Sequence, residues 1–216
     1  MNEIIDLYER YVEKLEDIVY NTIAVKLATF KGFDEMLKQD NETMFNTFPL
    51  LGLVTESLQV DNVITICKLL EVNPDGKTLI RFVNFTKVNY TTLKKRYPKL
   101  TKQTIEQDLY DFASLEQTAN RIKTQRDKYY AHSDNEYFFV PEKITHDFPN
   151  TYNDLSNILT TFQRIISRHS LIIKGNSRVC ISDFVYVNSY QTLEILKKAK
   201  VEFKNTKNDL TIDSEL

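Results

Sequence analysis

Apolar residues recur at the three- and four-residue spacing of an amphipathic helix along most of the 216-residue chain. The first such pattern begins at Ile4 and continues to Leu27, and it predicts a long helix that bends near Gly32. The next stretch, residues 44–72, is denser in apolar residues and restarts at Asp61, a residue type that often caps helix N-termini. It predicts one or two central, largely buried helices.

Residues 61–86 are compatible with two structures. The sequence "NPDG" at 73–76 separates "ITICKLLEV" from "KTLIRFV". A helix–turn–helix would use Thr78 as the cap of its second helix, whereas a β-hairpin would place "NPDG" in its turn. Both alternatives stay open from the sequence.

The strongest helical pattern predicts one continuous helix from Ile105 to Tyr130, with Arg126 in its apolar phase. The positions in this phase are Ile105, Leu109, Phe112, Leu115, Ala119, Ile122, Arg126 and Tyr129. Another helix is predicted to begin at Thr151, with Asp154 completing a capping box, and to end near Gly175. A short final helix around residues 190–196 precedes a polar tail, 203–216, that has too few apolar residues to pack.

Composition supports helices throughout. With four glycines and five prolines, the chain lacks the turn residues of an all-β fold, and its length suits one domain. The sequence therefore predicts an all-α protein with a single domain over residues 1–202, an extra short C-terminal helix and a flexible tail from residue 203.

Charge limits how the protein could bind nucleic acid. The formal net charge is −2, so no global positive field would hold RNA or DNA. Contacts would need a local patch, and one basic run without acidic residues supplies it. This basic run consists of Lys94, Lys95, Arg96, Lys99 and Lys102.

Several other classes of site have no support in the sequence. No glycine-rich phosphate loop, zinc spacing or serine nucleophile elbow is present, so no metal and no cofactor are predicted. Cys67 and Cys180 match no disulfide framework and are predicted to be reduced, buried thiols. The charged N-terminus is unlike a signal peptide, and no segment reaches membrane-spanning length. A cytoplasmic protein without membrane contact is expected.

An arginine in the apolar phase of a helix needs an explanation, because burying an unpaired charge costs several kcal/mol. Arg126 could form a structural ion pair with Glu116, Asp111 or a partner helix, or it could extend its guanidinium to the surface. Alternatively, it could face a cleft. His132, one of three histidines, follows it by six positions.

The segment "RDKYYAHSD" resembles the motif of HEPN domains, in which four to six residues separate an arginine from a histidine. The polar Asp127 directly after Arg126 also fits, and the segment is similar to the abortive-infection U-type (AbiU-like) branch. The apolar runs "DNVITICKLL" and "GKTLIRFVNF" extend this resemblance over about residues 1–172. It implies a helical bundle of HEPN type with long antiparallel helices.

The resemblance implies a metal-independent endoribonuclease. The 2'-hydroxyl of the RNA would attack the adjacent phosphate, with His132 transferring protons and Arg126 stabilising charge on the phosphorane. Asp127 would orient one of these two side chains. The helix is expected to end or loosen near Ala131, which would let His132 approach Arg126.

The resemblance also implies partners. Two motifs would meet across a homodimer two-fold to form one RNA-binding cleft, with an interface in the C-terminal half of the helix 105–130. Such a protein would act as a toxin or in antiphage defence and could have an antitoxin or another neutralising protein. Asp134 stands where adenylylated HEPN toxins carry a tyrosine, so silencing by that modification is not expected.

Two alternatives to the enzyme remain. One is a non-catalytic HEPN-type module that binds RNA or nucleotide or mediates dimerisation, and the other is a scaffold in which Arg126 and His132 are structural. Among the remaining polar residues, His146 is interpreted as a surface residue and His169 as a satisfied core residue. A second cationic cluster, Arg164, Arg168, Lys174 and Arg178, is interpreted as a solvated helix face rather than a phosphate site.

Overall fold

The computed structural model describes residues 2–39, 49–71, 78–131, 139–140, 142–149 and 151–212. Every regular element in these ranges is a helix, so the chain is all-α as predicted. Its contacts divide it into two compact units: residues 1–24 with 60–180, and residues 25–59 with 181–216. The single domain over residues 1–202 stays a prediction.

The first unit is built around α1 (Asn2–Glu16) and α11 (Tyr152–Lys174), which pack against each other. A π-helix, η1 (Asp17–Ile23), continues α1. The predicted capping box of Thr151 and Asp154 is present at the start of α11, and Gly175 ends this helix with a φ of 75°. The core side chains of the unit include Tyr8, Val12, Leu15, Phe82, Ile158, Phe162 and Ile165.

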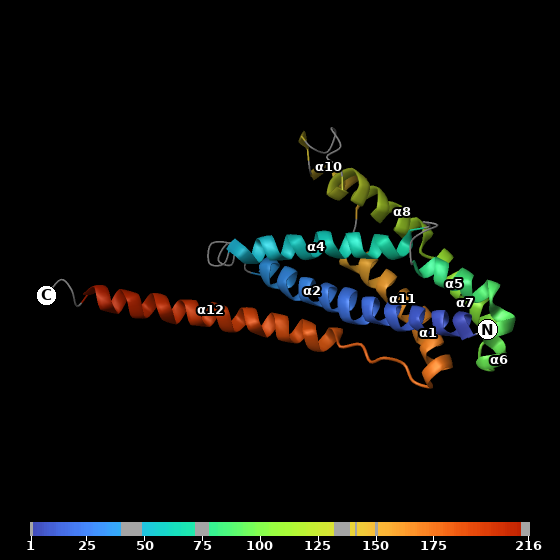
Figure 1. Cartoon of the computed structure of the whole chain (residues 1–216). Helices are drawn as coiled ribbons and strands as arrows, with labels where there is room; N and C mark the ends of the chain where they lie inside the picture. Colours follow the sequence, from blue (N-terminus) through green and yellow to red (C-terminus); the bar gives the residue numbers. More distant parts are fainter. Residues whose placement is uncertain are drawn as a thin grey trace. The chain divides into compact units, whose positions relative to one another are not determined.

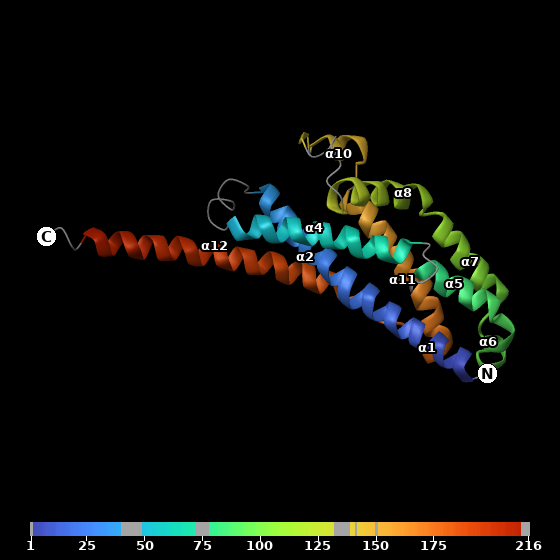
Figure 2. The ribbon, with the colours of Figure 1, turned by 45° about the horizontal axis from the view of Figure 1, so that its top comes forward.

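Three shorter helices belong to the same unit (Figures 1 and 2): α5 (Leu79–Val88), α6 (Tyr90–Arg96) and α7 (Lys102–Ala113). α5 and α6 pack against α1, and α7 packs against α5 and α11. The Thr78 hydroxyl accepts a hydrogen bond from the Arg81 backbone N–H, so Thr78 caps α5 as predicted. Helices rather than strands therefore flank the "NPDG" segment, whose residues lie outside the described ranges.

The predicted continuous helix from Ile105 to Tyr130 is wrong. The structure has α7, a turn at Ser114–Leu115, α8 (Glu116–Gln125) and a π-helix, η2 (Arg126–Ala131). The Ser114 hydroxyl donates to the Asp111 carbonyl at 2.7 Å, and such a local bond competes with the helical ladder. Since Leu115 keeps the apolar phase, the spacing of apolar residues gives no sign of this break.

One helix detail in the N-terminal part of the chain also differs from expectation. α4 (Pro49–Leu70) contains Asp61 in its interior rather than starting at it. α2 (Ala24–Gln39) includes Gly32, and the bend near this residue stays a prediction. Pro49 is the first residue of α4, a position where its missing N–H is not needed. One helix, α4, is therefore present where one or two were predicted.

The second unit consists of most of α2, the first half of α4 and α12 (Ser182–Ile212). Gly32 permits close packing of α2 on α12, because a Cβ at this position would lie 3.0 Å from the Ser189 Cβ. Met36 and Leu193 form its small buried cluster. α12 is longer than the short helix that was predicted and includes residues up to Ile212, as Figure 1 shows.

α4 is the one helix in the described ranges that is long and apolar enough to cross a membrane. The expectation that no segment reaches this length is therefore wrong, although core helices pass the same test. The C-terminal half of α4 lies in the first unit, where Val63, Ile66 and Leu70 are buried. A cytoplasmic location stays a prediction. The smaller helix α10 (Glu142–Asp147) completes the described elements.

Candidate functional site

Arg126 lies at the first residue of η2, directly after α8. Its Nε and Nη2 donate to Asp127 Oδ1, both at 2.7 Å, and its Nη1 donates to the Glu71 carboxylate. The Arg126 side chain is 17% exposed, so it is largely but not completely removed from solvent. Asp127 therefore contacts Arg126 directly, and its supporting role in catalysis stays a prediction.

The C-terminal end of α4 meets the end of α8 at this site. Besides the contact between Arg126 and Glu71, the Lys123 Nζ donates to the Leu70 carbonyl at 2.9 Å, which satisfies a carbonyl at the end of α4. Burial alone would lower the pKa of Arg126, but hydrogen bonds to Asp127 and Glu71 outweigh it and raise this pKa above its ordinary value. The guanidinium is thus fixed in its charged form.

Arg126 contacts neither of the acidic residues suggested as its partners within the chain, Glu116 and Asp111. Its partner outside η2 is Glu71, which directly follows the helix α4, so the predicted alternative of a partner helix is the one that agrees with the structure. Glu71 lies 55 positions away, and no local pattern links the two residues. A pocket of about 350 Å³ adjoins this pair. Its lining residues are Ile18, Thr22, Thr65, Lys68, Leu69, Glu71 and Thr78.

The α-helix becomes a π-helix at Arg126, where η2 begins, whereas the sequence predicted that the helix would end or loosen near Ala131. π-helical turns often occur at functional sites, because the extra residue shifts the direction of the side chains that follow. The apolar phase also shifts, since the side chain buried after Ile122 is Gln125 and not Arg126. His132 lies outside the described residues, so the predicted approach of His132 to Arg126 stays a prediction.

The basic run lies at the other end of the α7–α8 segment from Arg126. Lys94, Lys95 and Arg96 are in the last turn of α6, and Lys102 begins α7. Lys102 is the first residue of α7 and Arg126 follows the last residue of α8, with the turn at Ser114–Leu115 between the two helices. Within one protomer the structure therefore does not bring the basic run and Arg126 into one site.

Two residues of the basic run, Lys94 and Arg96, make contacts within the protein. The Lys94 Nζ donates to the Pro98 carbonyl at 2.5 Å, and the Arg96 guanidinium lies over the Tyr97 ring at 5.9 Å. Cations at the end of α6 also interact favourably with the helix dipole. The exposed Lys95, Lys99 and Lys102 are the members most open to a ligand.

A buried polar network joins α1, α7 and α11. The His169 Nε2 lies 2.7 Å from the Asp108 Oδ2, and its Nδ1 lies 2.7 Å from the Tyr8 hydroxyl. Arg168 bonds to both Asp108 and Asp111. Because His169 and Asp108 are fully buried, this arrangement is a structural network rather than a site for a substrate. His169 is thus a satisfied core residue, as predicted.

The sequence interpretation missed this network. Arg164 and Arg168 are not simply a solvated face, since Arg168 pairs with two buried aspartates and Arg164 lies 3.5 Å from Asp111. The available signal was the spacing: Asp108 and Asp111 follow Ile105 at three-residue steps, on the buried face of α7.

The remaining polar residues are simpler. His146 is a surface residue as predicted, with Asp147 at 3.1 Å. Cys67 is buried, which raises the pKa of its thiol to about 11, whereas Cys180 is exposed and the prediction of a buried thiol is wrong there. Among the described residues no group of three or more His, Cys, Asp or Glu side chains could hold a metal ion.

A family model for HEPN domains, described as AbiU2, matches residues 1–186. The chain belongs to this AbiU2 family of HEPN domains. The match includes Arg126, Asp127, His132 and the whole basic run, and it extends beyond the region of about 1–172 that the sequence resemblance suggested. Searches of curated proteins and of solved structures found no match.

Membership in the AbiU2 family relates the chain to abortive infection. It also gives the Arg126 site a context that contacts alone do not provide. An ion-paired arginine at a helix end is common in scaffolds. Here Arg126 lies within the matched region and begins the segment "RDKYYAH", which resembles the HEPN motif.

Proposed function

We propose that this AbiU2-family protein is a metal-independent endoribonuclease that acts in abortive infection or as a toxin, with Arg126 and His132 as its catalytic residues. The observation that carries the proposal is the position of Arg126. It is held by Asp127 at the first residue of a π-helix, six positions before His132, within the region matched by the family.

The proposed reaction needs no external nucleophile. The 2'-hydroxyl oxygen of the RNA forms a bond to the neighbouring phosphorus while the bond to the 5'-oxygen of the next nucleotide breaks. His132 transfers protons, taking one from the 2'-hydroxyl or giving one to the leaving oxygen. The products are a 2',3'-cyclic phosphate and a 5'-hydroxyl.

Arg126 would stabilise negative charge on the pentacoordinate phosphorus. A guanidinium carries five N–H donors, and Asp127 and Glu71 engage Nε, Nη1 and Nη2 once each. One N–H on each Nη nitrogen is then left to donate to phosphate oxygens in the bidentate manner that favours arginine at such sites.

A second candidate is a non-catalytic module that binds RNA. It is favoured by one observation: two carboxylates surround Arg126, and their charge opposes the approach of a phosphate. In this candidate, the basic run supplies RNA affinity and Arg126 only joins α4 to η2.

Cleavage of total cellular RNA in excess chelator tests the proposal. We expect activity for the wild type, a loss of about 100-fold or more for Arg126→Ala, and no activity for His132→Ala. Glu71→Gln is the matched control, because it breaks the same ion pair but keeps the Arg126 charge.

The catalytic proposal expects Glu71→Gln to retain cleavage within about three-fold, since the pair itself contributes little at this partly exposed site. Equal losses in Glu71→Gln and Arg126→Ala would instead assign the pair a structural role. No activity in the wild type, with RNA binding retained, would leave the binding module.

The partners belong to the same proposal. RNA is the substrate, and a homodimer would join two motifs in one cleft. A growth-restraining nuclease would also need control, so an antitoxin or another neutralising protein is an expected partner.

A further inference from the structure

A small pocket lies where α5, α6 and α7 meet, separate from the Arg126 site. It has a volume of about 300 Å³, at the lower end of the range of ligand pockets. α7 supplies one wall with residues on a single helical face, α6 supplies the Tyr90 ring, and α5 supplies Lys87. The full set of lining residues is Lys87, Tyr90, Lys102, Ile105, Glu106 and Leu109.

The chemistry of this pocket is divided between an apolar interior and a charged rim. Ile105 is buried, and Tyr90 and Leu109 are half-buried, so a flat apolar group could contact all three. Lys87, Lys102 and Glu106 are exposed. Neither lysine forms an ion pair with another residue in the described part of the chain, so both ammonium groups are available to anions.

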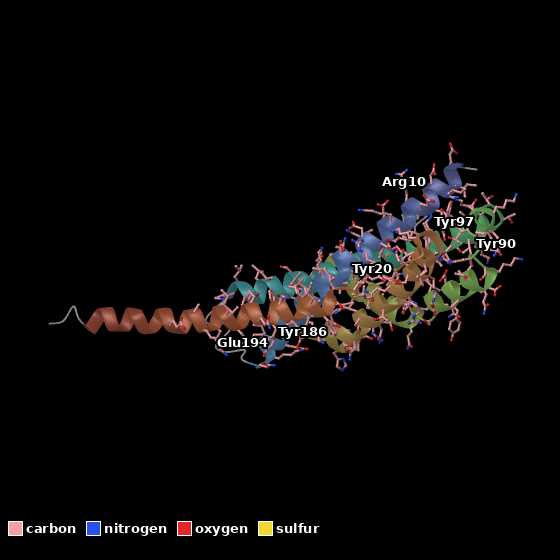
Figure 3. All side chains as sticks on the ribbon, turned by 90° about the horizontal axis from the view of Figure 1, so that it is seen from below. Arg10, Tyr20, Tyr90, Tyr97, Tyr186 and Glu194 are labelled. Atoms are coloured by element: carbon pink, nitrogen blue, oxygen red, sulfur yellow. The ribbon has the colours of Figure 1, made fainter. Side chains whose placement is uncertain are left out.

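We propose that this pocket binds one nucleobase of single-stranded RNA, with the flanking phosphates on Lys87 and Lys102. The inference rests on the proposed function only in taking RNA as the ligand. Aromatic rings that stack on bases, flanked by cations that contact the backbone, are the usual basis of single-strand binding. Lys102 also belongs to the basic run, which would carry the strand onward past Lys99 and Lys95. Figure 3 labels Tyr90, the first residue of α6.

Glu106 gives the pocket a base preference. A carboxylate accepts two hydrogen bonds, and guanine presents adjacent N1–H and N2–H donors that match its two oxygens. Uracil places one N–H between two carbonyl oxygens, which a carboxylate repels. Guanine is therefore the expected base, and uracil the least favoured.

The pocket is a binding subsite rather than part of the cleavage site. Lys102 and Arg126 lie at opposite ends of the α7–α8 segment, so a base in the pocket would lie several nucleotides away from the cleaved bond. Loss of the pocket should raise KM for long RNA and leave kcat unchanged.

The test uses full-length His132→Ala, so that binding is measured without cleavage. Its probes are oligouridylates that carry one central guanosine or, at the same position, an abasic site, with affinity measured by fluorescence anisotropy. We expect guanosine to bind at least about five-fold more tightly than the abasic site, the effect of one stacked base. Tyr90→Ala should remove this difference and leave the abasic affinity unchanged.

Three further variants complete the design. Tyr90→Phe keeps the aromatic ring and should therefore keep the higher affinity for guanosine than for the abasic site. Glu106→Gln should reduce the preference for guanosine over uridine. Tyr110→Ala is the matched control on α7, where the side chain is 70% exposed and does not line the pocket, and it should change nothing.

The proposed base-binding pocket would be refuted if His132→Ala bound the guanosine and abasic oligouridylates with equal affinity. It would also be refuted if the difference in affinity remained after Tyr90→Ala. Neither result depends on catalysis. Conversely, failure of the wild type to cleave RNA would refute the proposed nuclease and leave the pocket intact.

Discussion

Arg126 contacts one carboxylate from its own π-helix and one from the end of α4. These contacts explain how a charged residue can occupy a position in the apolar spacing of the helix. The Arg126 guanidinium is paired with two carboxylates, and the buried residue of this turn is Gln125 instead. Pairing alone does not distinguish a catalyst from a structural link. The distinction depends on what happens when Arg126 keeps its charge and loses Glu71.

Asp108 is the residue on which the buried network depends, because it accepts from both His169 and Arg168. Asp108→Ala should lower the free energy of unfolding by about 3–5 kcal/mol, since it leaves buried polar partners unsatisfied. Urea unfolding measures this loss. Glu106→Ala, an exposed change on the same helix, should cost less than about 0.5 kcal/mol. Similar midpoints for the two variants would contradict the role of the network.

At the scale of elements, the start of α11 has a cap that responds to pH. Burial alone would raise the pKa of Asp154, but hydrogen bonds from the Thr151 backbone and side chain, and the nearby Arg121, outweigh it and lower this pKa below its ordinary value. A carboxyl whose pKa is lower in the folded state stabilises the protein above its unfolded pKa of about 4. This contribution is lost as the pH falls through the lower, folded pKa.

Thr151→Ala should therefore destabilise the protein by about 1 kcal/mol at neutral pH. Asp154→Asn should also be destabilising at neutral pH, and its disadvantage relative to the wild type should shrink as the pH falls to about 3. Thermal unfolding at both pH values checks this. A disadvantage that is independent of pH would show that the Asp154 charge does not contribute.

The elements that the sequence predicts best are those with local chemical signals. Thr78, the pair Thr151 and Asp154, and Gly175 each mark a helix end through their own side chain or backbone freedom. The break after α7 has a local signal in Ser114, but the apolar spacing that continues through Leu115 conceals it. The π-helix at Arg126 has no such signal. Likewise, Glu71 and Asp108 acquire their roles only when distant segments meet.

At the scale of the whole molecule, the proposed cleft needs a second copy of the chain. We expect a homodimer whose interface includes α8 and η2, because the HEPN arrangement joins two Arg126 segments across a two-fold. Light scattering at micromolar concentration should give about twice the monomer mass of 25.4 kDa. A monomer at that concentration would contradict the shared cleft.

The two proposed RNA contacts would then have separate tasks. The pocket at Tyr90 and the basic run would set affinity and base preference, and the Arg126 segment would set the rate. Within one protomer they lie at opposite ends of the α7–α8 segment, since α6 precedes α7 and η2 follows α8. Figure 2 shows α6 and α8 on either side of α7. This separation explains why binding and cleavage should respond to different variants.

The most direct test of the central claim replaces a single oxygen of the substrate. Wild-type protein is incubated in chelator with an RNA that it cleaves and with the same RNA carrying a 2'-deoxy nucleotide at the cleavage position. The account predicts cleavage of the all-ribose RNA to a 2',3'-cyclic phosphate, identified by mass spectrometry, and none at the deoxy position. Cleavage at the deoxy position, or a product without the cyclic phosphate at early times, would contradict it.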